Sequence, residues 1–166
     1  MSTLVLGIDP GATGALALYS PEEATMLWVR DTPNQKMILT TGKKTTRVNV
    51  DELIEIFSSV VLTAHKYNCE LKVHIEKVNA YGKQSAPAAF SFGWAACAPF
   101  TIARTMKLET HLIHAAVWKR AIGLQASDKD DARLLARQLF PDFKDQLKRK
   151  LDVDRADAMF LAAHVF

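Results

Sequence analysis

An uninterrupted apolar run near the N-terminus constrains the fold of this 166-residue chain more than any other feature. Residues 4–8, Leu-Val-Leu-Gly-Ile, include no polar side chain, and Asp9-Pro10-Gly11 ends the run with residues that favour a turn. A strand that is apolar on both faces is typical of the centre of a sheet that is covered on both sides. The run therefore predicts a central strand with an acidic residue, Asp9, at its carboxyl end.

The rest of the chain supplies partners for such a strand. Hydrophobic patterns predict further strands at 15–19, 26–29, 71–77 and 111–114. Because a strand–helix–strand crossover within one sheet is right-handed and parallel, we expect the strand at 71–77 to lie parallel to the first strand or near it. The order of elements is typical of an α/β layered domain with a mixed sheet. Helices are predicted after a capping box at Asn49 and Glu52, at 86–105, at 115–122, at 128–139 with Ser127 as its cap, and at 153–164, while 32–48 is expected to form a long loop or a loose hairpin.

Length and composition exclude several classes of protein. The length suits one domain spanning 1–166, and 49% hydrophobic and 23% charged residues are ordinary for a globular chain. A net charge of +3 decides neither for nor against a nucleic-acid partner. The two cysteines form no CxxC motif, so a disulfide framework and a structural zinc site are not expected. Reduced thiols, and an N-terminus without the basic region of a signal peptide, predict a cytoplasmic protein.

One uncharged segment, 84–103, has the length of a membrane span. It also contains Pro87 and Pro99, polar Ser and Thr residues, and mainly Ala and aromatic side chains between them. This composition favours a buried or interface helix, and we expect no membrane association.

Four acidic residues stand out by position. Asp9 and Glu76 each follow an apolar strand, and Asp154 and Asp157 lie three residues apart, on one face of the last helix. Each has a plain structural explanation when taken alone: Asp9 as a turn residue, Glu76 as a surface residue, and Asp154 as a partner of the helix dipole. Asp157 is harder to explain in this way, because it interrupts an apolar stripe, and it is therefore a candidate for a functional site.

Together, these acids predict a chemistry that none of them predicts alone. Four carboxylates at adjacent strand ends and on a helix that crosses them repel one another at neutral pH unless cations neutralise them. Oxygen ligands suit Mg²⁺ or Mn²⁺. Two such ions could activate a water molecule and stabilise the leaving oxygen of a phosphodiester.

Three motifs resemble those of a known family. Gly7-Ile8-Asp9-Pro10-Gly11 with Thr13-Gly14 is similar to the opening motif of RuvC-type Holliday junction resolvases, in the ribonuclease H-like superfamily. Ile75-Glu76-Lys77-Val78 resembles the second acidic motif of that family, and Asp154-Arg155-Ala156-Asp157-Ala158 resembles its closing motif. Their order and spacing match over nearly the whole chain.

The resemblance implies a fold, an activity and an assembly. It implies a ribonuclease H-like fold, with a mixed five-stranded sheet in the order 3-2-1-4-5 and helices on both faces. It also implies an endonuclease with two Mg²⁺ or Mn²⁺ ions per active site, which cuts four-way DNA junctions by paired symmetric nicks. By position, Asp9, Glu76, Asp154 and Asp157 would be its metal ligands. The segment Phe92-Gly93-Trp94-Ala95 resembles the helix through which the family forms homodimers, and two sites on a two-fold axis would match a two-fold junction.

Basic and aromatic residues supply further candidates. By its position in the family, Lys119 would be catalytic and offset charge at the scissile phosphate, and Tyr81 could stack on an opened base. A run at 144–150 could follow the DNA backbone, although each of these lysines could also be merely solvated. His74, His114 and Trp118 are interpreted as structural or packing residues. Further candidates for DNA contact are Lys43, Lys44, Lys83, Arg120 and Lys129.

Two departures from the common bacterial pattern suggest a divergent member, such as a phage version. The turn after Asp-Pro-Gly is shorter, and the basic insertion at 36–47 is long. Alternative functions therefore stay open. A nuclease for flaps, single strands or RNA, including the RuvX-like branch, would need the same acids, whereas a non-catalytic DNA-binding module would gain nothing from them. An actin-like ATPase would need a second lobe, which this length excludes.

Overall fold

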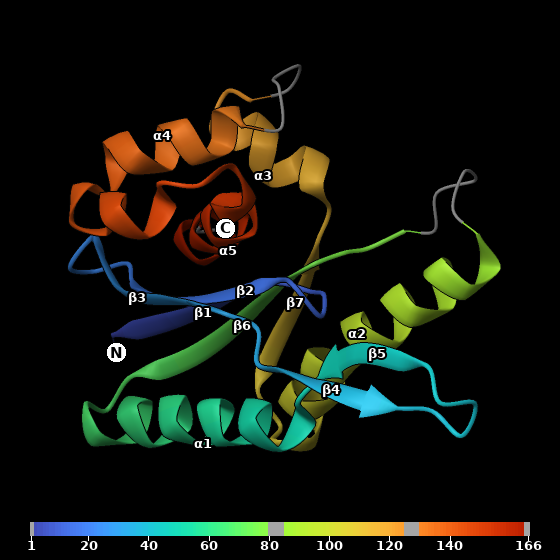
Figure 1. Cartoon of the computed structure of the whole chain (residues 1–166). Coiled ribbons are helices and arrows are strands. Elements are labelled where there is room, and N and C mark those ends of the chain that lie inside the picture. The colour runs from blue at the N-terminus through green and yellow to red at the C-terminus, as the bar shows by residue number, and fades with distance from the viewer. Residues whose placement is uncertain (1, 80–84, 125–129, 165–166) are drawn as a thin grey trace.

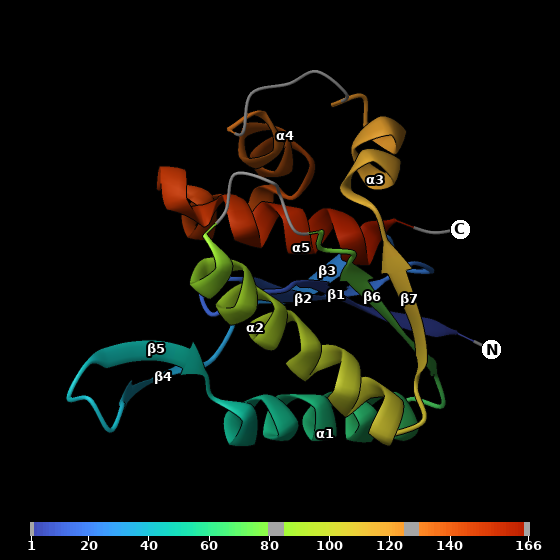
Figure 2. The ribbon, with the colours of Figure 1, turned by 90° about the vertical axis from the view of Figure 1, so that its right-hand side faces the viewer.

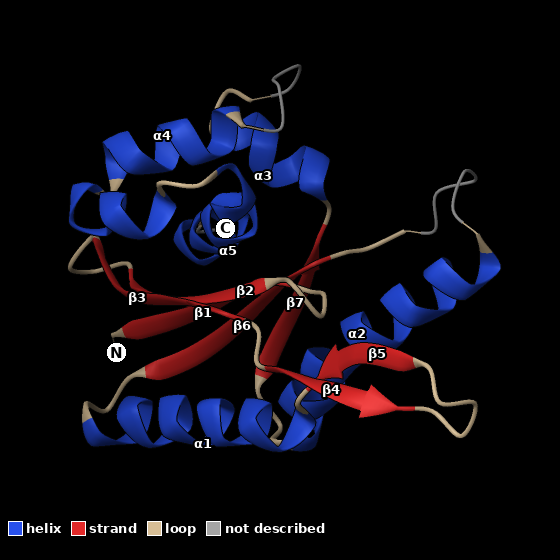
Figure 3. Ribbon diagram, viewed as in Figure 1, coloured by secondary structure: helices blue, strands red, loops and turns tan. Residues whose placement is uncertain are grey.

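The computed structural model describes residues 2–79, 85–124 and 130–164, and it places a five-stranded sheet between two layers of helices (Figures 1 and 3). The sheet order is β3-β2-β1-β6-β7. Its strands are β1 (Thr3–Asp9), β2 (Ala15–Ser20), β3 (Thr25–Asp31), β6 (Glu70–Glu76) and β7 (Glu109–Ile113). The helices are α1 (Val50–Lys66), α2 (Ala86–Thr105), α3 (Ala115–Ala121), α4 (Asp131–Leu139) and α5 (Val153–Ala163), with 3₁₀ segments η1 (Pro141–Leu147) and η2 (Lys150–Asp152) before α5.

The apolar run at 4–8 is the central strand, as predicted. β1 pairs antiparallel with β2 and parallel with β6, so that Leu6 lies opposite Leu18 on one side and Val73 on the other. Both faces of β1 are covered, which explains why it carries no polar residue between Thr3 and Asp9. The expectation that 71–77 runs parallel to the first strand is confirmed.

The sheet order differs from the expected 3-2-1-4-5, because the chain has two more strands than the sequence indicates. The segment expected as a long loop or loose hairpin forms β4 (Asn34–Ile38) and β5 (Lys44–Val48), an antiparallel pair separate from the main sheet. Every residue of β4 is exposed, so no alternation of buried and exposed positions marks it as a strand. The fourth and fifth strands of the main sheet are therefore β6 and β7.

Two helical layers cover the sheet. α1 and α2 lie on one face, while α5, flanked by α3 and α4, lies on the other (Figures 1 and 2). Each layer has its own hydrophobic core: Phe57 and Ile102 belong to the first, and Trp118 and Phe160 to the second. Asn49 caps α1 as predicted, since its side chain accepts a hydrogen bond from the backbone N–H of Glu52.

The uncharged segment forms the long helix α2. By length and composition alone, α2 could cross a membrane, and 22% of its most apolar stretch is buried within the protein. Its buried residues pack against the first core, with Ala95, Ile102 and Ala103 among them. A helix in the core of a soluble protein can have the same length and composition, so the absence of membrane association stays a prediction.

The start of α4 differs from the expected one. The helix begins at Asp131 rather than at 128, and Ser127, its expected cap, lies outside the described residues. Asp130 precedes the helix and binds the buried Arg133, whose guanidinium also donates to the backbone oxygen of Leu147 at 2.7 Å. This buried arginine joins α4 to the end of η1.

Candidate active site

Two of the four acids are placed by the sheet itself. Asp9 ends β1 and Glu76 ends β6, and these strands are parallel neighbours in which Ile8 pairs with Ile75. After Asp9 the chain turns back at once: a Cβ atom at Gly14 would lie 2.1 Å from the backbone oxygen of Asp9, so only glycine fits there. The tight turn inferred from the short Asp-Pro-Gly segment is therefore present, and it directly follows Asp9 of the candidate site.

The other two acids are carried by α5, which crosses the sheet at very close range. A Cβ atom at Gly7 would lie 2.3 Å from the backbone oxygen of Ala158, so glycine permits this approach. Arg155 anchors the same helix to β3, since its guanidinium donates to both carboxylate oxygens of Asp31, at 2.6 and 2.7 Å. This bidentate pair stands between Asp154 and Asp157 in the sequence and fixes the turn that carries them.

The acids at this end of the sheet raise one another's pKa values. Burial raises the pKa of Asp9 well above its usual value, and the charges of Glu76, Asp157 and Asp154 raise it further. Burial also raises the pKa of Asp157 to about 7, against the opposing charge of Lys119. These mutual effects show that Asp9, Glu76, Asp154 and Asp157 form one electrostatic cluster, although they come from β1, β6 and α5.

The charge of the cluster is poorly compensated. Lys119 is the cation that lowers the pKa of Asp9, Glu76 and Asp157 alike. Within the described part of the chain, the buried Oδ1 atom of Asp157 has no hydrogen-bond partner. A buried oxygen of this kind is normally satisfied, so it indicates a missing partner of positive charge.

The donor set fits a divalent cation in its chemistry. Carboxylate oxygens are the ligands that Mg²⁺ and Mn²⁺ prefer, and a bound cation would relieve both the repulsion and the unpartnered oxygen. As the side chains lie, no three His, Cys, Asp or Glu residues among those described are gathered closely enough to form a ligand set. The acids therefore converge without adopting the geometry of coordination.

Glu76 has a hydrogen-bond donor that the sequence did not reveal. The indole N–H of Trp118 donates to its Oε2 atom at 3.0 Å, and Lys119, the next residue, places its Nζ atom 5.2 Å from the centre of the Trp118 ring. Trp118 was expected to be a packing residue, and it is fully buried, but it also binds the acid. His114, also expected to pack, is instead an exposed residue at the N-cap of α3.

A comparison with solved structures identifies the fold that this site occupies. The structure of T. thermophilus RuvC in complex with Holliday junction substrate matches 97% of this chain and 90% of its own chain, with a TM-score of 0.55 and 21% sequence identity. The chain has the RuvC fold. A second Thermus thermophilus RuvC structure matches 97% of this chain and 92% of its own, with 20% identity and a TM-score of 0.49. Neither models of protein families nor curated protein sequences give a match.

The RuvC fold confirms the resemblance inferred from the three motifs. At this level of identity the likeness establishes the fold, not the activity. The mixed sheet with helices on both faces agrees with the expected α/β class.

The remaining candidate residues lie in four places. Arg120 is exposed on α3, and Lys43 and Lys44 are exposed on the β4–β5 hairpin. On α2, Gly93 and Trp94 are exposed and Phe92 is partly buried, whereas Ala95 packs into the first core and is not available to a second copy. Tyr81, Lys83 and Lys129 lie outside the described residues.

The basic run at 144–150 is partly neutralised within the protein. Lys148 lies 3.0 Å from Asp145, and Arg149 binds the buried carboxylate of Asp152 at 2.7 Å. Asp152 stands at the N-cap of α5, but its side chain binds Arg149 rather than the start of the helix. Lys144 and Lys150 are the exposed cations of this run that have no close acidic partner among the described residues.

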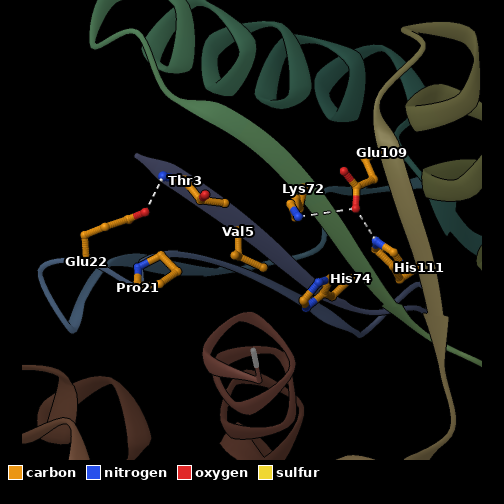
Figure 4. Close-up of a pocket in the computed structure, with 8 residues that line it drawn as sticks. All are labelled: Thr3, Val5, Pro21, Glu22, Lys72, His74, Glu109 and His111. Carbon is orange, nitrogen blue, oxygen red and sulfur yellow. Dashed lines mark hydrogen bonds and ion pairs between the residues drawn. The ribbon is translucent and has the colours of Figure 1, made fainter. Parts of the chain in front are cut away.

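A cavity of about 240 Å³ lies on the same face of the sheet as α5, toward the other end of the strands (Figure 4). His74 and His111 pack edge to face in it, and Glu109 binds both Lys72 and His111. His74 is the structural histidine that the sequence predicted, because its Nδ1 atom lies 2.9 Å from the backbone oxygen of Leu161. None of the four clustered acids lines this cavity.

Proposed function

We propose that this chain is a metal-dependent, structure-selective endonuclease that resolves four-way DNA junctions by paired symmetric nicks. The observation that carries the proposal is the poorly compensated cluster of Asp9, Glu76, Asp154 and Asp157 at one end of a sheet with the RuvC fold. A cluster of this kind raises the energy of the folded chain, and its retention is explained by a cation that it binds.

In this proposal, Asp9, Glu76, Asp154 and Asp157 hold the metal. A pair of divalent ions would supply Lewis-acid stabilisation of the phosphate and a water molecule of lowered pKa. Asp9 and Glu76 stand on strands of the central sheet, which fixes their backbones more firmly than a loop would. Asp157 contributes the buried oxygen that has no partner within the described residues.

Lys119 would act on the phosphate rather than on the metal. It is the cation whose charge reaches three of the four acids, and it is only partly buried. An ammonium group in this position offsets negative charge as it develops on the scissile phosphate. Its effect should therefore fall mainly on the rate of cleavage.

The β4–β5 hairpin supports a nucleic-acid substrate. Residues 34–48 include four basic residues and no acidic one, and Lys36, Lys43 and Lys44 are exposed. The base of the hairpin is attached to the candidate site, since Asn34 donates to the backbone oxygen of Ala12 at 3.2 Å, in the turn that follows Asp9. Its lysines are thus placed to hold a phosphate backbone that enters the site.

The structural neighbour supports the choice of a four-way junction. That protein is described in complex with a Holliday junction substrate. In this chain, Arg47 links the hairpin to α2, because it donates to Ser91 Oγ at 2.9 Å and lies over the ring of Trp94. The surface that would hold DNA is therefore joined to the helix that we propose as the dimer interface.

The proposed homodimer forms through α2. Phe90 and Trp94 pack edge to face and remain 68% and 54% exposed, which is unusual for aromatic residues of a free surface. Gly93 lies between them with open space around it, so Gly93→Glu should fit the protomer while adding a charge to the interface. We expect sedimentation to show a dimer for the wild type at micromolar concentration and a monomer for the variant. A monomeric wild type, with and without DNA, would contradict the interface.

The substrate is tested by incubating the protein with a labelled four-way junction, a flap and a plain duplex, each with Mg²⁺ or with EDTA. We expect symmetric paired nicks in the junction that disappear with EDTA. Preferred cutting of flaps, single strands or RNA would keep the fold and the acids but assign the alternative substrate class.

The free thiols of Cys69 and Cys97 support a cytoplasmic location for this activity.

A further inference from the structure

Trp118 is the unexpected partner of the acid cluster. It donates its indole N–H to Oε2 of Glu76 at 3.0 Å, a hydrogen bond that links α3 to the end of β6 across 42 residues of sequence. The bond is charge-assisted when Glu76 is ionised, which makes it stronger than a bond between neutral groups.

The buried surroundings of Trp118 direct its indole N–H to Glu76. The side chain is 0% exposed, and its ring stacks on Phe160 of α5 with 6.0 Å between centroids and 15° between planes. Phe140 in turn packs against Phe160, with 6.1 Å between the ring centroids. A buried indole N–H requires an acceptor, so the stack that orients the ring also aims the donor at Glu76.

The backbone fixes Trp118 from the other side. The N–H of Lys77 donates to the backbone oxygen of Ile113 at 2.7 Å, so β6 and β7 are still joined one residue after Glu76. α3 begins two residues after Ile113, and Trp118 is one turn into it. The acid and its donor are thus carried by two strands whose ends are tied together, which limits how far they can separate.

We propose that Trp118 is a positioning residue that holds one oxygen of Glu76, so that the other oxygen would be left to bind a divalent cation in the acid cluster. This inference rests on the proposed function, because it assigns Glu76 as a metal ligand. A carboxylate with one oxygen held by a neighbouring donor presents the other in a defined direction, as groups around ligands do in metal sites. Removing such an outer partner typically weakens metal binding about 10–100-fold.

Two replacements separate the hydrogen bond from the packing. Trp118→Phe keeps an aromatic ring against Phe160 and removes the donor. Replacement of Trp118 by 3-benzothienylalanine keeps the full shape and has sulfur in place of the N–H. Trp28→Phe is the matched control, because Trp28 is a partly buried tryptophan of the opposite core, beneath Arg30 and away from the acids.

The readout is Mn²⁺ binding to the free protein by calorimetry, without DNA, together with the melting temperature of each variant. We expect Mn²⁺ affinity to fall about tenfold or more in both Trp118 variants and to stay within about twofold in Trp28→Phe. The benzothienyl variant should keep the wild-type melting temperature to within a few degrees, because its shape is unchanged.

Two results would overturn the inference alone. Unchanged affinity in both Trp118 variants would show that the hydrogen bond does not orient a ligand. A loss in Trp118→Phe with none in the benzothienyl variant would assign the effect to packing. A wild-type protein that binds no Mn²⁺ would overturn the metal-dependent function, and the inference would fall with it.

Discussion

The two ends of the central sheet handle charge in opposite ways. At the amino end of the strands, Glu109 binds Lys72 and His111, while Glu22 accepts a hydrogen bond from the backbone N–H of Thr3 (Figure 4). At the carboxyl end, Asp9 and its neighbouring acids face one another with Lys119 as the shared cation.

The contrast separates charges that are satisfied within the protein from charges that repel one another. At the amino end, Glu109 and Glu22 have partners within the protein, so these two acids need nothing from outside. At the carboxyl end, burial and mutual repulsion raise the pKa values of the acids, and Lys119 and the indole N–H of Trp118 oppose these shifts only in part. A cavity lined by paired charges is thus a weaker candidate for catalysis than a cluster of acids that repel one another.

The strongest test of the contrast is Asp157→Asn. If Asp157 holds the metal as proposed, the change removes a ligand and part of the repulsion toward phosphate, so we expect cleavage of a four-way junction to fall by about a thousandfold or more, with binding intact or tighter. Single-turnover cleavage in Mg²⁺ and a binding titration in EDTA measure the two effects separately. Near-normal cleavage would remove Asp157 from the site.

The two ends should also respond to pH with opposite signs in the absence of divalent ions. The pKa of Asp157 is about 7 in the folded protein, against a usual 3.8, so its contribution to stability is full below 3.8 and is lost as the pH rises through 7. The pKa of buried His74 is about 4, against a usual 6.5, so its contribution is full above 6.5 and is lost as the pH falls through 4.

Urea unfolding between pH 4 and 8 measures both effects. In EDTA at pH 8 we expect Asp157→Asn to be more stable than the wild type, by at most about 4 kcal/mol, and to lose less stability as the pH rises. His74→Gln should lose stability more steeply than the wild type over the same rise. Identical pH profiles for the wild type and Asp157→Asn would contradict the mismatched cluster.

Lys119→Ala tests the cation that the acids share. In the proposed function, its loss would leave the scissile phosphate without an offsetting charge, so cleavage should slow about 10–100-fold, while junction affinity changes less than about threefold. Rates at saturating protein, compared with binding in Ca²⁺ or EDTA, make the distinction. An equal loss in both would make Lys119 a simple backbone contact.

Glu109→Gln at the amino end should have the smallest effect. Its ion pairs are largely exposed, and pairs of that kind contribute less than about 1 kcal/mol. We expect cleavage within about twofold of the wild type and little change in urea unfolding. A large loss of cleavage would show that the two ends are coupled, and the contrast between them would have to be abandoned.

Much of the fold could be predicted from local patterns. The central strand, its parallel neighbour β6 and the cap of α1 each follow from periodicity or from turn and capping residues that act over a few positions. The hairpin β4–β5 is predicted only as an alternative to a loop, because the exposed side chains of β4 give no alternation. The predicted start of α4 at residue 128 is wrong. The helix begins at Asp131, and the side chain of the preceding residue, Asp130, binds Arg133 rather than capping the helix.

The site shows a sharper limit of sequence reasoning. From the sequence, two strand ends and a helical spacing of three residues predict that the four acids come together. The hydrogen bond from Trp118 to Glu76 could not be inferred, because it joins residues 42 apart through the packing of α3 on Phe160. The ion pair between Arg155 and Asp31 could not be inferred either, because it joins residues 124 apart in the sequence.

The most direct test is thermal unfolding of the wild type and Asp157→Asn across a Mg²⁺ titration without DNA. If the acid cluster is a cation site, the wild type should gain melting temperature as Mg²⁺ rises, whereas Asp157→Asn should start higher and gain little. A wild type that shows no gain, or a variant that gains as much from a lower start, would contradict a cluster built to bind divalent cations.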